Sequence, residues 1–188
     1  MVETILFDMD GVLVDSKEAW YQSFNEVKKI SREDFDNFFW GRDLQVNLKT
    51  LGIGKEKFCR QVFPKHLESI EVFPDVKKIL EKRKEKMAVV TNTIGICAKQ
   101  ILKKAELTKL FQGIFTSDMA NEGKPNPELL LKACQKLNRN VSQTVMVGDT
   151  ISDMDAARSA GMLSIGLRVQ GDYSIETLSE LNELLTRI

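Results

Sequence analysis

The sequence predicts an α/β fold: a Rossmann-like parallel core sheet of five strands, with a small helical cap inserted after the first strand. Short apolar runs without polar alternation recur along the chain, as expected for strands that are buried on both faces of a parallel sheet. Helical patterns separate the later runs, which indicates right-handed crossovers between parallel strands. A long stretch between the first two runs shows only helical patterns, and this stretch predicts the cap.

The predicted strands are short and rich in β-branched residues: Thr4–Phe7, Met87–Thr91, Gly113–Thr116, Thr144–Val147 and Leu163–Leu167. Helices are predicted between the last four strands, at Lys99–Ala105, Glu128–Leu137 and Asp153–Ala160. Asn126 and Pro127 form a typical start for the second of these helices, and Gly161 is a typical end for the third.

The predicted cap is a helical insertion. From Asp15 to Pro74 the sequence shows no strand pattern, and Trp20, Phe24 and Val27 share one face of its first helix. Connections in such folds usually have about 2–6 residues, so a helical stretch of about sixty residues is expected to form a unit of its own. We therefore expect residues 1–14 and 75–188 to form the α/β core and residues 15–74 to form the cap.

The composition excludes several classes of function. Lysine plus arginine and aspartate plus glutamate both number 27, so no basic excess favours nucleic acid or an anionic membrane surface as a partner. No segment approaches the roughly 20 apolar residues of a membrane span. Cys59, Cys97 and Cys134 follow no metal-ligand spacing, which fits reduced thiols. His66 is the only histidine, which argues against Ser-His-Asp and zinc-histidine chemistry. We expect a cytoplasmic monomer.

The first predicted strand ends in two aspartates, Asp8 and Asp10, followed by Gly11. Because side chains alternate between the faces of a strand, the two carboxylates are expected on the same face where the chain leaves the sheet. Carboxylates this close repel each other unless a cation joins them. The pair fits a nucleophile, an acid/base and a hard-cation site, but a plain acidic turn would show the same residues.

Two further motifs carry groups that bind anions. Thr91 and Asn92 end the second predicted strand, and both side chains can donate hydrogen bonds to an oxyanion. Taken alone, this pair also fits a helix cap. Lys124 lies just before a predicted helix start, where its charge would add to the helix dipole and favour a phosphate. A solvated lysine in a proline-rich turn is the alternative.

The fourth motif places Asp149 and Asp153 after the fourth predicted strand, where either residue could also cap a helix. All four motifs lie at the carboxyl ends of predicted strands, which is where open α/β sheets bind ligands. They meet if the strands run in the order fifth, fourth, first, second, third. This order brings Asp8 and Asp10 beside Asp149.

Four segments carry a resemblance to a known family: FDMDGVLVDS (Phe7–Ser16), VVTNT (Val89–Thr93), GKPNPE (Gly123–Glu128) and VGDTISDMDAARSAGM (Val147–Met162). The four segments occur in the order and in the strand contexts of the haloacid dehalogenase superfamily, which essentially the whole chain resembles. The similarity is to its phosphoglycolate phosphatase-like and β-phosphoglucomutase-like branch, which has a helical cap. The dehalogenases of the superfamily lack the second aspartate and do not need Mg²⁺, so Asp10 favours phosphoryl transfer.

The resemblance implies a role for each motif residue. Asp8 would be the nucleophile and Asp10 the general acid/base. Thr91 would bind the phosphate, and Lys124 would neutralise the phosphoryl group and the nucleophile. From its own position at the strand end, we also expect Asn92 to bind the substrate.

The resemblance also implies Mg²⁺ as cofactor and a cap loop that faces the substrate. The metal would be held by Asp8, Asp149 and the main-chain carbonyl of Asp10, with Asp153 close to it, often through water. The segment Trp40-Gly41-Arg42 resembles the cap loop. We expect the Arg42 guanidinium to bind a carboxylate or second phosphate on the substrate, and a position over the cap surface is the alternative.

The function implied is a Mg²⁺-dependent phosphatase that hydrolyses a small phosphorylated metabolite through an aspartyl-phosphate on Asp8. A phosphomutase of the β-phosphoglucomutase type would use the same residues. A non-catalytic protein that binds a phosphorylated ligand is a further alternative, although a mere binder has no need of Asp10.

Overall fold

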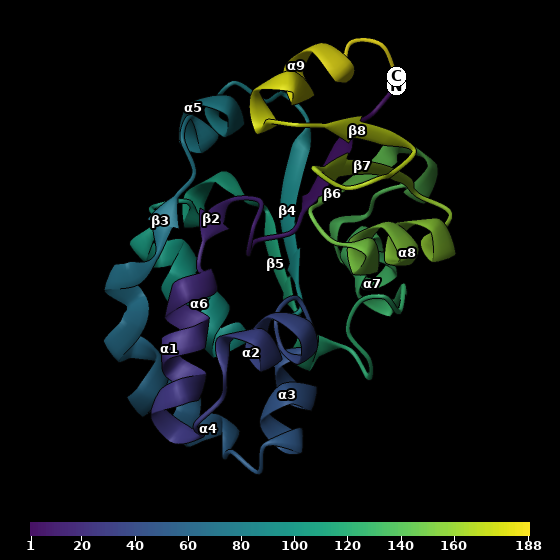
Figure 1. The fold of residues 1–188 in the computed structure, drawn as a ribbon. Coiled ribbons are helices and arrows are strands. Elements are labelled where there is room, and N and C mark those ends of the chain that lie inside the picture. Colours follow the sequence, from purple (N-terminus) through teal and green to yellow (C-terminus); the bar gives the residue numbers. More distant parts are fainter.

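The computed structural model describes all 188 residues and has a parallel sheet at its centre. The strands of this sheet are β1 (Thr4–Phe7), β4 (Lys86–Thr91), β5 (Gly113–Thr116), β6 (Thr144–Gly148), β7 (Leu163–Leu167) and β8 (Tyr173–Ile175). Their order is β5-β4-β1-β6-β7-β8, and every neighbouring pair is parallel (Figure 1). The predicted α/β fold and the predicted order of the first five strands are confirmed.

The sheet has six strands, so the expectation of five strands was wrong. The added strand, β8, lies at the edge and pairs with β7 over three residues. Only Ile175 of this strand is buried, and the other two residues face solvent. Such a short and mostly polar run gives no periodic signal, because its pairing depends on the neighbouring strand and not on its own apolar content.

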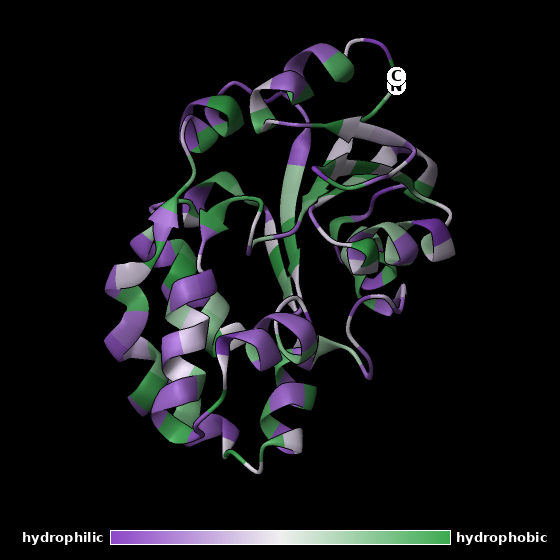
Figure 2. Ribbon diagram, viewed as in Figure 1, coloured by the Kyte–Doolittle hydropathy of each residue, from purple (hydrophilic) through white to green (hydrophobic).

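Helices cover both faces of the sheet: α5 (Val76–Glu81), α6 (Gly95–Lys104), α7 (Glu128–Leu137), α8 (Ile151–Ala160) and α9 (Leu181–Leu184). Successive residues of β1 point to opposite faces, so Ile5 and Phe7 join a large cluster that includes α6. Leu6 joins a smaller cluster with α7 and α8. Hydrophobic residues accordingly concentrate on the strands and on the inner helix faces (Figure 2).

A helical segment follows the first strand, as expected. It contains α1 (Lys17–Val27), α2 (Arg32–Phe38), α3 (Leu44–Thr50), α4 (Lys55–Lys57), the π-helix η1 (Phe58–Val62) and the 3₁₀-helix η2 (Phe63–Ser69). We use "helical segment" below for residues 17–69. In Figure 1 it lies below the sheet, on the side away from the two chain ends.

A second, two-stranded sheet closes the helical segment at its base. The strand β2 (Val14–Asp15) pairs antiparallel with β3 (Glu71–Val72), so the chain enters and leaves the segment side by side. The expectation that Asp15 to Pro74 holds only helices was therefore wrong at both ends. Strands of two residues are too short to show a periodic hydrophobic pattern in the sequence. The exact limits of a cap at residues 15 and 74 stay a prediction.

The helical segment is packed by aromatic rings. Trp20 stacks on Phe63 with ring centroids 4.1 Å apart, and Phe24 lies 5.3 Å from Phe58. These rings belong to the same buried cluster of 37 residues as Ile5 and the other strand residues. The segment therefore packs directly on the sheet. No helix of the protein has both the length and the apolar composition that crossing a bilayer requires.

Candidate active site

The predicted motifs meet at the carboxyl end of the sheet. The strand β1 lies between β4 and β6, with Phe7 level with Val89 and with Val147. The Asp8 amide donates to the Val147 carbonyl at 2.9 Å, which ties the residue after β1 to the adjacent strand. This register brings the ends of the three central strands together, as the sequence predicted.

Three carboxylates gather at this edge. Asp8, Asp149 and Asp153 each offer an oxygen within 4.8 Å of the others. Glycines make this approach possible. Gly11 has a φ of +85°, and a Cβ at this position would lie 2.0 Å from Asp149 Oδ2. A Cβ at Gly148 would lie 2.3 Å from Asp153 Cβ. Both glycines are thus required for the acidic cluster to form.

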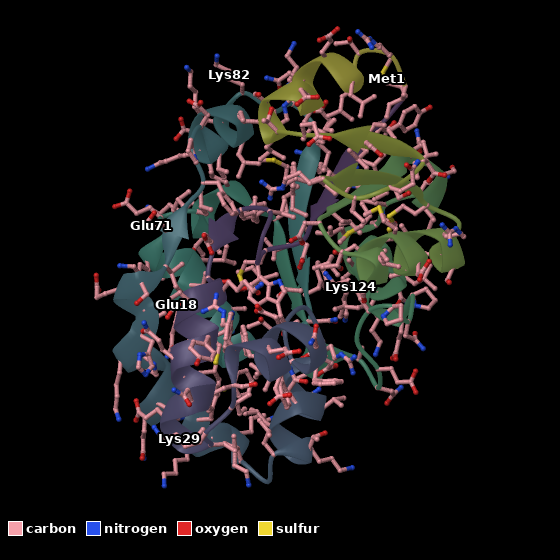
Figure 3. All side chains as sticks on the ribbon, viewed as in Figure 1. Met1, Glu18, Lys29, Glu71, Lys82 and Lys124 are labelled. Carbon is pink, nitrogen blue, oxygen red and sulfur yellow. The ribbon has the colours of Figure 1, made fainter.

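Lys124 is the one cation inside this cluster. Its Nζ lies 2.8 Å from Asp8 Oδ1 and 2.6 Å from Asp153 Oδ1, and it donates to the Val90 carbonyl at 2.9 Å. Lys124 is only 4% exposed. Figure 3 shows it inside the molecule, unlike Lys29 and Lys82 on the outside. A solvated lysine in a turn is therefore excluded.

The acidic cluster contains more carboxylates than cations, and burial shifts the pKa values of its members. Burial raises the pKa of Asp8 well above its usual value, against the opposing effect of Lys124. Burial and the neighbouring Asp153 raise the pKa of Asp149 to about 7. Burial alone would lower the pKa of Lys124, but Asp153 and Asp8 outweigh it and hold that pKa above its usual value. Three carboxylates face one ammonium, so the cluster has an excess of negative charge.

The cluster fits a hard divalent cation. Its donors are all oxygens, which Mg²⁺ prefers. Asp149 Oδ1 is buried and has no hydrogen-bond partner, which costs free energy unless a cation or water meets it. Asp153 also caps α8, because its Oδ2 accepts from the Thr150 hydroxyl at 2.6 Å. Its Oδ1 still points to Lys124, so Asp153 does more than cap a helix.

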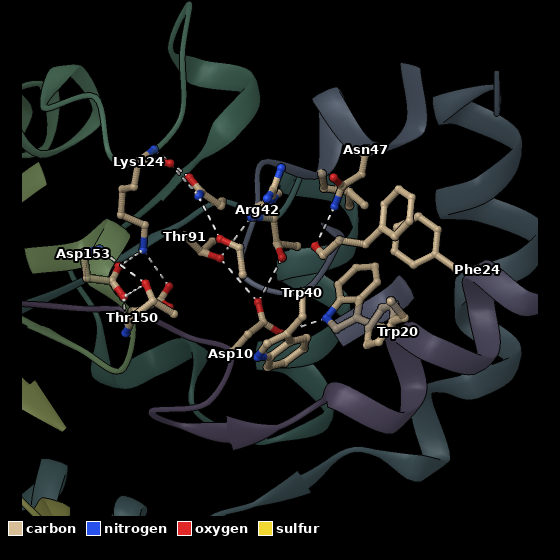
Figure 4. A pocket seen from close by; sticks show the side chains of 17 residues that line it. Asp10, Trp20, Phe24, Trp40, Arg42, Asn47, Thr91, Lys124, Thr150 and Asp153 are labelled. Atoms are coloured by element: carbon tan, nitrogen blue, oxygen red, sulfur yellow. Dashed lines mark hydrogen bonds and ion pairs between the residues drawn. The ribbon is translucent and has the colours of Figure 1, made fainter. Parts of the chain in front are cut away.

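The Asp10 carboxylate lies outside the cluster and is held by four donors. Trp20 Nε1 donates to Oδ1 at 2.9 Å, and the Ser16 hydroxyl donates to the same oxygen. The Thr93 hydroxyl donates to Oδ2 at 2.9 Å, and the Thr91 hydroxyl lies 3.5 Å from it (Figure 4). The two aspartates at the end of β1 therefore have separate surroundings, one beside Lys124 and one facing the helical segment.

Thr91 and Asn92 differ in the hydrogen bonds that their side chains make. Thr91 is buried beside Asp10, and its hydroxyl also accepts from the Thr93 amide at 3.1 Å. Both polar atoms of Asn92 serve the main chain of Lys124: Nδ2 donates to its carbonyl at 2.9 Å, and Oδ1 accepts from its amide at 2.8 Å. Asn92 therefore holds the main chain of Lys124 in place, and its contact with a substrate stays a prediction.

A pocket lies between the sheet edge and the helical segment. Asp8, Asp10, Thr91 and Lys124 line one wall, and the opposite wall is largely aromatic, with Trp20, Phe24, Phe35, Phe39 and Trp40. The two walls are also joined by hydrogen bonds. The Leu44 amide donates to the Asn92 carbonyl at 2.9 Å, and Asn92 Nδ2 donates to the Gly41 carbonyl at 3.3 Å.

Arg42 lines this pocket from the helical segment. It is exposed, and its guanidinium makes one long hydrogen bond, 3.5 Å to the Asn37 carbonyl. No carboxylate pairs with it within 4.0 Å. The guanidinium is therefore available to an anionic group in the pocket.

Comparison with known proteins decides the family. Residues 5–167 match the family model described as haloacid dehalogenase-like hydrolase. The chain belongs to this family. The phosphoglycolate phosphatase of Aquifex aeolicus is 32% identical over 176 residues, which cover 85% of this chain and 82% of that protein. The predicted family and the predicted enzyme class, phosphoric monoester hydrolase, are confirmed.

Two further comparisons extend this result. Pyrophosphatase PpaX of Bacillus mycoides is 26% identical over 212 residues, which cover 100% of this chain and 98% of that protein. The fold also matches a crystal structure of a subfamily IA hydrolase of the superfamily from Geobacter sulfurreducens. That match has a TM-score of 0.82 at 21% identity and covers 98% of this chain and 100% of the other. The similarity extends over the whole length of these proteins.

The sequence did not point to three contacts of Asp10. Ser16 and Thr93 lie inside the motif segments Phe7–Ser16 and Val89–Thr93, so their place in the motifs could have indicated them. Trp20 was assigned only to the apolar face of a helix. Nothing in its spacing indicates that the indole N–H reaches a carboxylate ten positions earlier.

Proposed function

We propose that this hydrolase is a Mg²⁺-dependent phosphatase that cleaves a small phosphate monoester through an aspartyl-phosphate on Asp8. The observation that carries the proposal is the pairing of Asp8 with Lys124 beside two further carboxylates, while Asp10 is held separately a short distance along the chain. This arrangement supports two different roles for two neighbouring aspartates, one as nucleophile and one as acid/base.

Asp8 is proposed as the nucleophile because it lies at the sheet edge with its charge partner in place. The Lys124 ammonium, 2.8 Å from Asp8 Oδ1, stays protonated at neutral pH and offsets the repulsion between the carboxylate and an incoming phosphate. Thr91 is proposed to donate to a phosphate oxygen.

The proposed ligands of Mg²⁺ are the carboxylates of Asp8 and Asp149 and the main-chain carbonyl of Asp10, with Asp153 nearby. When bound, the metal supplies positive charge against the anionic phosphoryl group. The unpaired Asp149 Oδ1 and the excess of negative charge support this assignment.

Asp10 is proposed to protonate the leaving oxygen and then to take a proton from the water that hydrolyses the aspartyl-phosphate. General acid–base catalysis of this kind contributes about 10²–10⁴-fold. We further propose that residues 15–74 act as a cap whose aromatic wall excludes bulk water from the pocket. The proposed setting is the cytoplasm, with the protein acting as a monomer on a small phosphorylated metabolite.

The test is a substrate panel with a nucleophile variant. Phosphoglycolate, pyrophosphate and glucose phosphates are supplied with Mg²⁺ or with a chelator, and both free phosphate and sugar phosphate isomers are measured. We expect phosphate release that requires Mg²⁺ and is absent in Asp8→Asn. Isomer formation without phosphate release would identify a phosphomutase. Binding without any turnover would identify a non-catalytic protein, and full activity in chelator would overturn the proposal.

A further inference from the structure

The hydrogen bonds of Asp10 come from two sides and differ in kind. Oδ1 receives the Trp20 indole N–H at 2.9 Å and the Ser16 hydroxyl. Oδ2 receives the Thr93 hydroxyl at 2.9 Å, with the Thr91 hydroxyl at 3.5 Å (Figure 4). Hydroxyl groups can turn and either donate or accept, but an indole N–H can only donate. Trp20 is therefore the one partner of this carboxylate whose role cannot reverse.

The direction of the indole N–H is fixed by packing. Trp20 is 4% exposed, and its ring stacks on Phe63 at a centroid distance of 4.1 Å and an interplanar angle of 19°. Phe58 lies nearly parallel to it, with centroids 6.5 Å apart. A ring held in such a stack cannot swing away from the carboxylate without opening the aromatic cluster of the helical segment.

We propose that Trp20 is a positioning residue for the reaction: its N–H fixes Asp10 so that Oδ1 stays an acceptor and Oδ2 exchanges the proton with the substrate. This inference rests on the proposed function, in which Asp10 is the general acid/base. An oxygen that faces a donor-only group cannot hold a proton in that direction. The proton then belongs on Oδ2, where the hydroxyls of Thr93 and Thr91 can turn to accept it.

The donor and the acid/base come from different parts of the fold. Asp10 follows β1 of the sheet, while Trp20 lies on α1 of the helical segment and lines the pocket between the two. The hydrogen bond therefore crosses the substrate pocket. The hydrogen bond from Trp20 to Asp10 forms only when the helical segment is packed against the sheet, which links the closed pocket to the proton transfer.

The test removes the N–H and keeps an aromatic ring at position 20. In Trp20→Phe, kcat/KM is measured for phosphate esters whose leaving groups differ in acidity, because kcat/KM reports the first phosphoryl transfer. A nitrophenolate leaves without a proton, whereas a simple alkoxide needs one. We expect about a tenfold loss with an alkyl phosphate and less than about a threefold loss with p-nitrophenyl phosphate.

A matched control separates positioning from packing. Leu48→Ala removes a buried side chain of the same helical segment, and Leu48 is neither among the hydrogen-bond partners of Asp10 nor part of the pocket lining. We expect it to lower the melting temperature without changing how kcat/KM depends on the leaving group. If Trp20→Phe does not fold, replacement of Trp20 by benzothienylalanine exchanges the N–H for sulfur at nearly constant shape. The selective loss with alkyl phosphates is expected there too.

Two results would overturn the inference. A loss of equal size with alkyl and nitrophenyl phosphates would assign Trp20 a purely structural role. No loss with either substrate would show that the N–H has no effect on the acid/base. Both results leave the proposed function intact, because that function fails only if the wild-type protein has no Mg²⁺-dependent phosphatase activity or if Asp8→Asn retains it.

Discussion

Asp149→Asn is expected to stabilise the metal-free protein while it removes the response to Mg²⁺. Asp149 Oδ1 is buried without a partner, and burial together with Asp153 raises the pKa of this carboxyl to about 7 from an ordinary value of 3.8. A carboxyl with a raised pKa favours folding while it is protonated. The metal-free protein therefore loses stability as the pH rises from about 4 to above 7, where the native state must hold the charge.

The magnitude follows from the two pKa values. Each pKa unit corresponds to about 1.4 kcal/mol, so the charged carboxylate costs up to about 4 kcal/mol at pH 8. Asparagine removes the charge but leaves a buried amide that must find partners, so we expect roughly half of this, about 2 kcal/mol, to be recovered. For a chain of this length, 1 kcal/mol shifts the melting temperature by about 2–4 °C. The metal-free variant is then expected to melt about 4–8 °C above the metal-free wild type.

The assay is thermal unfolding at pH 8, in chelator and in excess Mg²⁺. At about one hundred times its dissociation constant, a ligand stabilises the native state by about 2.7 kcal/mol, and we expect this gain in the wild type only. The matched control is Asp155→Asn, which removes a charge from the exposed side of α8, where Asp155 pairs with Arg158. Asp155→Asn should neither raise the melting temperature of the metal-free protein nor remove its stabilisation by Mg²⁺. A metal-free Asp149→Asn variant that melts below the wild type, or an undiminished Mg²⁺ response, would refute the reasoning.

Two further predictions concern the cations of the pocket. Lys124→Ala is expected to lower kcat by about 10²–10³-fold, because it removes a buried charge beside Asp8, where the phosphate is proposed to bind. Lys103→Ala, which removes the same charge from an exposed position on α6, should change kcat less than twofold, and similar losses in both would contradict the placement of Lys124. Arg42→Ala is expected to raise KM about tenfold for substrates with a second anionic group and hardly at all for neutral aryl phosphates. Lys49→Ala, on the exposed face of α3, is its control, and an equal rise with both substrate types would assign Arg42 a structural role.

The sequence predicted the sheet well because its signals are local. Each central strand is an apolar run, and every run ends in a polar motif. The requirement that the four motifs meet was enough to place β6 beside β1 and to derive the order of five strands. The edge strand β8 and the pair of β2 and β3 lacked such signals, because two or three residues pair only when the rest of the fold brings them together.

In the site, too, the sequence predicted features that depend on local pattern and missed contacts that depend on tertiary packing. The residue types and their strand positions identified the carboxylates and Lys124. They did not reveal that the Asn92 amide is occupied by the main chain of Lys124, or that the Trp20 N–H reaches Asp10. Both contacts join parts of the chain whose proximity is set by packing, and hydrophobic periodicity describes only which face of an element is buried.

The central claim is that Asp8 forms a covalent bond to the transferred phosphoryl group. It is tested by quenching the enzyme in acid during turnover, reducing with borohydride and sequencing the peptides by mass spectrometry. Reduction converts an acyl-phosphate aspartate to homoserine, which marks the position that held the phosphoryl group. We predict homoserine at position 8 in the wild type with substrate and Mg²⁺, and none in Asp8→Asn. Turnover with homoserine at no position, or at Asp10 or Asp149 in place of Asp8, would contradict the account.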